Sequence, residues 1–276
     1  MFEVIPEIGI VDARNVINAI KEYHNYDFKD FALAAFKHRI EIFLLNNNIK
    51  NCELLIRSLR DKRVFDNFLC ETAVEETEMF RDPSLWRILR DDIFPKEITT
   101  KSKYRIWLPF VVSGEELFSL VIVLQEADKM QQTEILASVV AAQLSEKIKT
   151  GFMNQKKLEI SEQNYNRYQG TSTFTSYFTG NDAQIRRDVA LIKQVQFFVQ
   201  HITFDNAPKK VNMILFRNQM IYYNFQLKDT VLSILDGCLD EGGFLIIGFK
   251  ETLKGHQIEE RYTLVSESES IYRKKN

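Results

Sequence analysis

Glycine, proline and cysteine are scarce in this chain, with ten, five and three residues among 276. The three cysteines, Cys52, Cys70 and Cys238, show neither metal-ligand spacing nor an even disulfide framework. Cys52 and Cys238 stand among apolar residues, which predicts buried thiols. The four histidines are equally scattered, with no carboxylate or cysteine at ligand spacing, so we expect no metal site.

The sequence also lacks an excess of one charge and any long apolar run. Its formal net charge is −2, which argues against binding nucleic acid by bulk electrostatics. No stretch is long and apolar enough to span a bilayer, and residues 1–3 lack the basic start of a signal peptide. We therefore expect a cytoplasmic protein with no membrane span and no nucleic-acid partner.

The first third of the chain has a helical pattern. Val16, Ile17 and Ile20 recur at the spacing of one helix face, and further apolar stripes follow as far as residue 95. A small helical bundle is the simplest structure for this pattern. We predict that residues 1–95 form an N-terminal helical domain.

Strands and helices alternate through the rest of the chain, residues 96–276. The apolar runs predict strands at 105–108, 135–139, 195–199, 213–216 and 244–249, and a closing hairpin of 259–265 and 271–273. The segments between them predict helices at 115–126, 140–149, 183–193 and 226–239. This order indicates a mostly parallel sheet with helices on both faces. The polar segment 154–180 is predicted to be an inserted loop or small subdomain.

Four segments carry recognisable motifs: EETEMFRDP at 75–83, YRIW at 104–107 with SGEE at 113–116, FRNQMIYY at 216–223, and LDEGGFLIIGFKE at 239–251. In this order they resemble the CheR family, the methyltransferases that esterify glutamates of bacterial chemoreceptors. The family patterns are N-x-T-x-x-F-R-D-P, R-I-W-S-A-G-C-S-T-G-E-E, C-R-N-x-x-I-Y-F and G-G-x-L-x-x-G-x-x-E. The resemblance covers nearly the whole chain.

The resemblance implies an α/β fold, with a helical N-terminal domain followed by a Rossmann-like class I methyltransferase domain that uses S-adenosylmethionine. A receptor glutamate attacks the activated methyl group of this donor. The protein therefore mainly positions donor and acceptor. The implied partner is a chemoreceptor or another signalling protein.

Five positions match family residues near the donor. The resemblance gives Arg81 and Tyr222 as catalytic positions, and Thr77, Glu116 and Asn218 as cofactor-binding positions. Plainer roles are also open: Arg81 pairing with a nearby aspartate, Glu116 favouring a helix dipole, and Tyr222 acting as a core aromatic.

Four other positions depart from the family pattern. Phe110 replaces a small residue, and its ring would occupy space that the methionine part of the donor needs. Val139 replaces the Asp that accepts hydrogen bonds from the ribose hydroxyls. Ile202 replaces the Asn expected beside the adenine, and Glu75 replaces the Asn of the first motif. Removing one polar partner from a buried site costs about 1–3 kcal/mol, so these changes predict weakened donor binding.

The receptor-facing helix is altered as well. CheR enzymes carry an arginine-rich helix in the N-terminal domain, and the matching segment here, 35–43, keeps only Lys37 and Arg39 firmly basic. This predicts weaker docking of an acidic receptor helix by that route.

Three functions fit these observations. Our leading hypothesis is a CheR-type protein that has lost efficient S-adenosylmethionine binding and acts through protein contacts in a chemosensory or two-component pathway. The alternative is an active protein-glutamate O-methyltransferase whose pocket is rebuilt around Phe110 and Val139. A third is the binding of another small ligand at the retained polar positions. The space beside Glu116 distinguishes the three, since only an active enzyme requires a cavity with an acceptor for two ribose hydroxyls.

Overall fold

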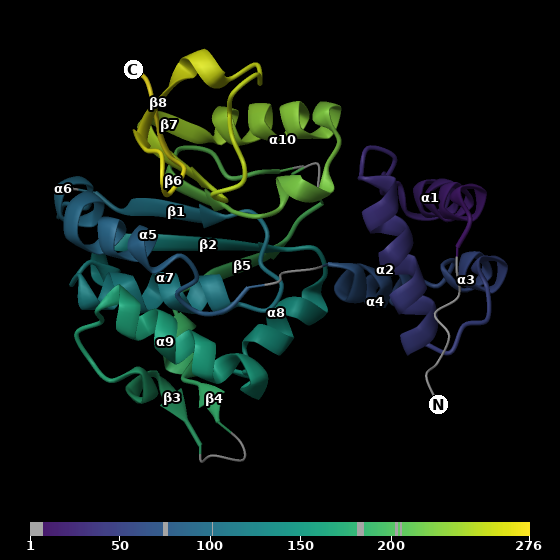
Figure 1. Ribbon diagram of the computed structural model, residues 1–276, viewed down its shortest axis with the longest axis horizontal. Coiled ribbons are helices and arrows are strands. Elements are labelled where there is room, and N and C mark those ends of the chain that lie inside the picture. Colours follow the sequence, from purple (N-terminus) through teal and green to yellow (C-terminus); the bar gives the residue numbers. More distant parts are fainter. Residues whose placement is uncertain (1–7, 74–76, 101, 181–184, 202–203, 205) are drawn as a thin grey trace.

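The computed structural model describes residues 8–73, 77–100, 102–180, 185–201, 204 and 206–276. A bundle of four helices lies beside a larger domain built on a sheet, as Figure 1 shows. The bundle consists of α1 (Ile10–His24), α2 (Leu33–Asn46), α3 (Cys52–Ser58) and α4 (Lys62–Thr72). The predicted helical N-terminal region is confirmed.

Aromatic rings hold the bundle together. Phe36 and Phe43 of α2 both meet Phe68 of α4 in edge-to-face contacts, and Phe28 packs on Phe36. All four rings are buried. Such pairs add about 0.5–1.5 kcal/mol each beyond the area they bury, so a small bundle gains stability from them.

The sheet has seven strands in the order β5-β2-β1-β6-β7-β9-β8. They are β1 (Tyr104–Leu108), β2 (Thr133–Val139), β5 (Gln196–Val199), β6 (Val211–Phe216), β7 (Leu239–Ile247), β8 (Tyr262–Ser266) and β9 (Ile271–Lys274). The first five strands of this order are parallel, and β9 runs antiparallel to both of its neighbours. The carboxyl ends of β1, β2 and β6 therefore meet at one edge, the usual place for a ligand in such a sheet.

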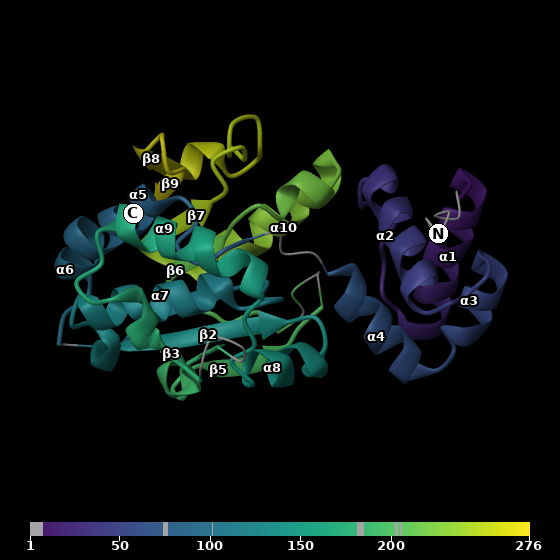
Figure 2. The same ribbon diagram turned by 60° about the horizontal axis from the view of Figure 1, so that its bottom comes forward.

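Helices cover the sheet on both sides (Figures 1 and 2). They are α7 (Glu115–Glu126), α8 (Ala142–Ile148), α9 (Leu158–Tyr168) and α10 (Phe225–Cys238), together with α5 (Pro83–Ile88) and α6 (Phe94–Glu97), which a π-helical turn joins. α5 packs on α9, and the π-helical turn packs on α7. Residues 83–97 thus lie against the sheet domain, while the domain boundary at residue 95 stays a prediction.

One predicted helix is wrong in its described part. Instead of a helix at 183–193, the chain forms β4 (Arg186–Arg187), which pairs with β3 (Phe178–Thr179), and a short 3-10 turn at Val189–Ile192. Arg187 explains the difference, because its side chain is buried, with the guanidinium 4.5 Å from the Phe118 ring centroid and donating to the Ser113 carbonyl. These contacts hold the backbone extended at Arg187.

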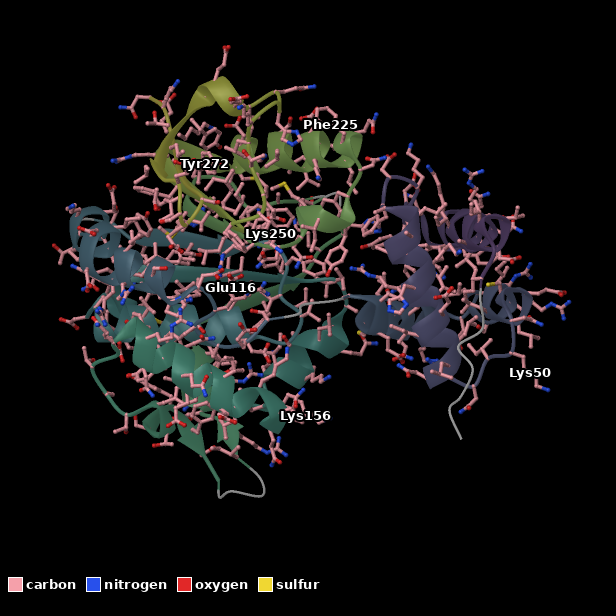
Figure 3. All side chains as sticks on the ribbon, viewed as in Figure 1. Lys50, Glu116, Lys156, Phe225, Lys250 and Tyr272 are labelled. Carbon is pink, nitrogen blue, oxygen red and sulfur yellow. The ribbon has the colours of Figure 1, made fainter. Side chains whose placement is uncertain are left out.

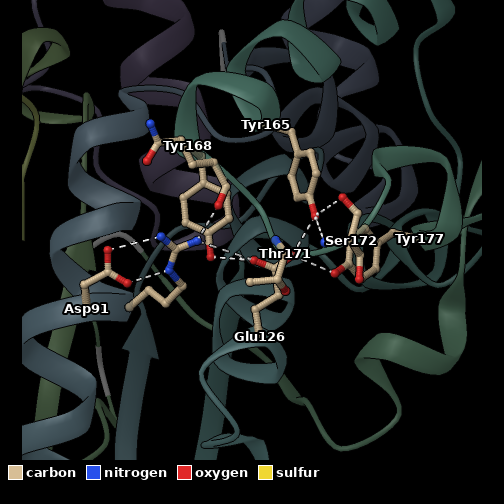
Figure 4. A network of polar contacts seen from close by, with 9 residues as sticks. Asp91, Glu126, Tyr165, Tyr168, Thr171, Ser172 and Tyr177 are labelled. Carbon is tan, nitrogen blue, oxygen red and sulfur yellow. Dashed lines mark hydrogen bonds and ion pairs between the residues drawn. The ribbon is translucent and has the colours of Figure 1, made fainter.

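The segment 154–180 contains α9 and is fixed to the end of α7 by a buried carboxylate. Glu126 accepts hydrogen bonds from the hydroxyls of Tyr165 at 2.6 Å, Tyr168 at 2.8 Å and Tyr177 at 2.8 Å (Figure 4). The backbone N–H of Thr171 donates to the same group at 3.2 Å. Burial, followed by hydrogen bonding to Glu126, raises the pKa of Tyr168. The carboxylate therefore ties α9 and residues 171–177 to the end of α7.

Replacing this carboxylate tests its role. We expect Glu126→Gln to lower the free energy of unfolding by about 1–3 kcal/mol, because the amide keeps only one of the two accepting oxygens and its NH₂ group cannot accept from a buried hydroxyl. Urea unfolding measures the change, and Glu162→Gln on the exposed face of α9 serves as the control. Equal stability of the two variants would contradict the role given to Glu126.

Candidate functional site

Two loops at the carboxyl edge of the sheet form the candidate site. The loop after β1, residues 109–114, leads into α7, and Gly114 caps that helix in the left-handed region with φ +87°. A Cβ at Gly114 would lie 3.1 Å from Ile148 Cγ2, so both conformation and space favour glycine. The second loop follows β6 at residue 217.

Glu251 fixes the backbone of the second loop. Its carboxylate accepts the N–H groups of Asn218 at 3.0 Å, Met220 at 2.7 Å and Gly248 at 2.6 Å. Burial raises the pKa of Glu251, and the three N–H donors and Arg217 oppose that rise. Asn218 adopts a left-handed conformation with φ 59°, which Asn tolerates better than most residues. The G-x-x-E motif thus supports the R-N motif through main-chain contacts.

Arg217 connects three distant parts of the chain. Its guanidinium donates to Glu116 Oε1 at 2.7 Å and to Asp82 Oδ2. The Arg217 side chain is only 4% exposed, and its Nε atom has no hydrogen-bond partner among the described residues. Two carboxylates therefore compensate one buried cation.

The five retained family positions come together. Thr77, Arg81, Glu116, Asn218 and Tyr222 all line one cavity of about 140 Å³, which we term the polar chamber. Figure 3 labels Glu116 and a further lining residue, Lys250. The catalytic and cofactor-binding roles of the five stay predictions.

The structure shows contacts that fit the helix-dipole role of Glu116 and a packing role for Tyr222. Glu116 lies in the first turn of α7 and also pairs with Arg217. The Arg39 guanidinium lies 4.3 Å from the Tyr222 ring centroid. Arg39 lies on α2, in the segment 35–43 that the resemblance matches to a receptor-facing helix. Here it turns toward the sheet domain, and burial lowers its pKa.

Aromatic side chains close the space between the bundle and the sheet domain. Half-buried Phe110 stands with Phe28, Phe31 and Tyr223 around a residual cavity of about 20 Å³. We term these four residues the aromatic wall. Aromatic rings from the N-terminal region and from the sheet domain thus fill the space beside the loop after β1.

The end of β2 is closed as well. Val139 is 1% exposed, so its apolar side chain is part of the core. Beside it, the Ser138 hydroxyl accepts from Trp107 Nε1 at 2.8 Å and donates to Gln200 Oε1 at 2.7 Å. Glu75 and Ile202, the two other departures from the family pattern, lie outside the described residues.

Main-chain hydrogen bonds join the two parts of the chain. The N–H of Ala32 donates to the Tyr222 carbonyl at 2.8 Å, and the N–H of Asn224 donates to the Asp30 carbonyl at 2.9 Å. Phe31 and Tyr223 form the β-bridge between them. The bundle is therefore attached directly to the loop that carries Tyr222.

Sequence reasoning gave no role to Arg217 or Glu251. Both belong to motifs that were recognised, so a signal existed. The motifs do not reveal the contacts of these residues. Arg217 binds carboxylates more than 100 positions away in the chain, and Glu251 binds three backbone N–H groups.

The family model for the CheR methyltransferase S-adenosylmethionine-binding domain matches residues 75–269. The chain belongs to the CheR methyltransferase family. The helical N-terminal region and the mixed α/β sheet that follows it agree with the class I methyltransferase fold predicted from the sequence.

Several relatives are similar to this CheR-family chain over most of their length. Cher3 of Pseudomonas putida is 27% identical over 265 residues, which cover 96% of this chain and 97% of Cher3. Chemotaxis protein methyltransferase 1 of Pseudomonas aeruginosa is 25% identical, with coverages of 86% and 88%. A chemotaxis protein methyltransferase of Listeria innocua is 24% identical, with coverages of 79% and 80%.

The described part of this CheR-family chain contains no helix with both the length and the apolar character needed to cross a membrane. Its cysteines are free, and Cys52 and Cys238 are buried as predicted.

Removing Arg217 tests the ion-pair bridge. We expect Arg217→Met to lower the free energy of unfolding by about 3–5 kcal/mol, because Glu116 and Asp82 would keep their charges in a partly buried place. The lower end of that range is expected because Asp82 is 30% exposed. Urea unfolding measures the change.

The double variant Arg217→Met/Glu116→Gln provides the control, since it removes one stranded charge and should recover part of the loss. A cost below about 1 kcal/mol for the single variant would show that the bridge contributes little.

Proposed function

We propose that this CheR-family protein is impaired in S-adenosylmethionine binding and acts through protein contacts in a chemosensory or two-component pathway. The observation that carries the proposal is the aromatic wall. Phe110 stands on the loop where the family places a small residue, and it lines the same small cavity as Phe28 and Phe31, which lie between α1 and α2.

The available volume supports this proposal. Ligand pockets usually measure about 300–1,000 Å³, whereas the polar chamber has about 140 Å³ and the space at the aromatic wall about 20 Å³. The donor has an adenosine and a methionine part, and neither of these two spaces alone is large enough for the whole molecule. The polar chamber also adjoins an open groove of about 840 Å³, with which it shares Thr77, Arg81 and Phe249. Placing the donor beside Phe110 would require the aromatic wall to move.

The side chains that line the polar chamber also argue against donor binding. Among the described residues that line the polar chamber, Glu116 is the only carboxylate, and Arg217 already binds it. Val139 offers no acceptor to a ribose. A donor bound here would leave its hydroxyls unpaired, at a cost of about 1–3 kcal/mol for each buried group.

An active methyltransferase of chemoreceptor glutamates with a rebuilt pocket is the second candidate. The meeting of Thr77, Arg81, Glu116, Asn218 and Tyr222 in one chamber favours it. If the donor entered beside Phe110, the bundle would have to move away from the loop that carries Tyr222, and the hydrogen bonds between residues 30–32 and 222–224 oppose that movement.

The partner is proposed from the relatives. Two of them are named chemotaxis protein methyltransferases, which supports a chemoreceptor or another chemosensory protein as the partner of this chain. We propose a cytoplasmic location for the same reason.

Thermal unfolding with 1 mM S-adenosylhomocysteine tests the proposal. A ligand at about a hundred times its dissociation constant stabilises a fold by roughly 2.7 kcal/mol, which gives a visible rise in Tm. We expect no rise for this chain, and a clear rise for a CheR protein with the complete family motifs under the same conditions.

A rise for this chain would refute the proposal and favour the second candidate. Transfer of a labelled methyl group from S-adenosylmethionine to receptor glutamates would then be the measurement to make. The variant Phe110→Ala separates the causes further, since a rise in the variant alone would assign the block to that ring.

A further inference from the structure

The strand β5 forms one end of the seven-stranded sheet, and no step of the proposed function uses it. Its one neighbour among the described strands is β2, while β8 forms the opposite end of the sheet. Figures 1 and 2 both place β5 on the side of the sheet away from the C-terminal hairpin. The outer edge of β5 therefore has no strand paired with it in the described part of the chain. We term residues 194–200 the β5 edge.

The hydrogen bonding of β5 shows which main-chain groups face outward. The N–H of Gln200 donates to the Val139 carbonyl of β2 at 2.9 Å. Main-chain groups of successive residues in a strand point to alternate sides, so the even-numbered residues of β5 face β2. Phe197 and Val199 therefore direct their N–H and C=O groups to the open side. The Val195 carbonyl points the same way.

The β5 edge lacks the features that usually keep a sheet edge from pairing with another chain, namely charged side chains, prolines and bulges. Its sequence, QVQFFVQ, contains no charge, no proline and no glycine. Val199 is 59% exposed and Phe197 is half-buried. The Lys149 ammonium lies 5.5 Å from the Phe197 ring centroid, but it is paired with Glu146 at 2.9 Å. No uncompensated charge on these residues therefore opposes an approaching strand.

The sequence of the β5 edge reads nearly the same in both directions about Phe197. The mirrored pairs are Val195 with Val199 and Gln194 with Gln200, and the mismatched pair is Gln196 with Phe198. If two copies pair antiparallel with Phe197 at the centre, each residue lies opposite its mirror position. Apolar side chains then meet apolar side chains on one face of the sheet. A twofold axis between identical chains produces this arrangement, which selects a second copy as the occupant of the edge.

We propose that two copies of this chain pair through their β5 edges, antiparallel and centred on Phe197. The outward main-chain groups fit this register, because hydrogen-bonded pairs recur at every second residue of an antiparallel ladder. The Phe197 N–H of each copy donates to the Phe197 carbonyl of the other, and each Val199 N–H donates to the Val195 carbonyl of the other copy. The Val195 N–H already donates to the Ile192 carbonyl at 3.0 Å and adds no bond.

The pairing joins the two sheets into one continuous sheet, with the twofold axis perpendicular to it. The carboxyl ends of the parallel strands then point in opposite directions in the two copies. The two polar chambers therefore lie at opposite edges of the dimer, and a partner bound at one chamber leaves the other accessible.

Sedimentation equilibrium of the full chain over a range of micromolar concentrations tests the pairing. We expect the mass to rise with concentration to twice the 32.4 kDa of one chain. The mass should level off there, because each chain has a single β5 edge and a twofold pair uses both edges.

A lysine on the edge locates the interface. Val199→Lys brings a charge into the contact with the other copy and should weaken dimerisation about ten-fold or more. Val265→Lys is the matched control, since Val265 is 48% exposed on β8, the strand at the opposite end of the sheet. We expect the control to dimerise like the unsubstituted chain, and thermal unfolding confirms that both variants fold.

Disulfide formation tests the register with Phe197 left in place. Residues opposite one another in a hydrogen-bonded pair have Cα atoms about 5.5 Å apart, a distance that a disulfide spans. We therefore expect a disulfide-linked dimer when a Val195→Cys chain and a Val199→Cys chain are mixed and oxidised. Either variant alone should give little, because identical positions are offset along the paired strands. The unsubstituted chain, with its own three cysteines, is the control.

A monomer at every concentration would overturn the inference, as would growth beyond the dimer. Equal effects of Val199→Lys and Val265→Lys, or a disulfide pattern that does not require both cysteine variants, would also contradict it. None of these results bears on the proposed function, which fails by a different one, a rise in Tm with S-adenosylhomocysteine.

Discussion

The candidate site depends on one buried guanidinium. Arg217, at the end of β6, holds Glu116 at the start of α7 and Asp82 just before α5, so three distant segments meet at one point. A buried cation requires such compensation, because desolvation without a partner costs several kcal/mol. The contact that builds the polar chamber therefore also occupies the carboxylate that lines it, Glu116. A ligand that needs a free carboxylate must compete with Arg217 for it.

The sequence predicted the parts of the fold whose signal is local. The five parallel strands follow from apolar runs, and the predicted helix at 115–126 coincides with α7. The helix predicted at 183–193 failed because burial of Arg187 is a tertiary effect that no periodicity reveals. α9 was missed for a related reason. Its inward face carries tyrosines that are satisfied by Glu126, and such a face does not look apolar in the sequence.

The candidate site was predicted as a set of positions rather than as a set of contacts. The motifs gave the five residues that line the polar chamber, because family patterns mark positions directly. They did not give the inward turn of Arg39 onto Tyr222, which depends on how the bundle rests against the sheet. Nor did they give the aromatic wall, since the rings of Phe28 and Phe31 come from a different part of the chain than Phe110.

The β-bridge between Phe31 and Tyr223 has a consequence for how the two parts of the molecule move. Apolar contacts allow sliding, since one methyl group can replace another at little cost. Paired main-chain hydrogen bonds do not, because they fix direction and register together. The bundle and the sheet domain are therefore held in one relative direction and one register. Widening the space between the bundle and the sheet domain therefore requires the hydrogen bonds between residues 30–32 and 222–224 to break. Such an opening is a discrete step and not a gradual motion.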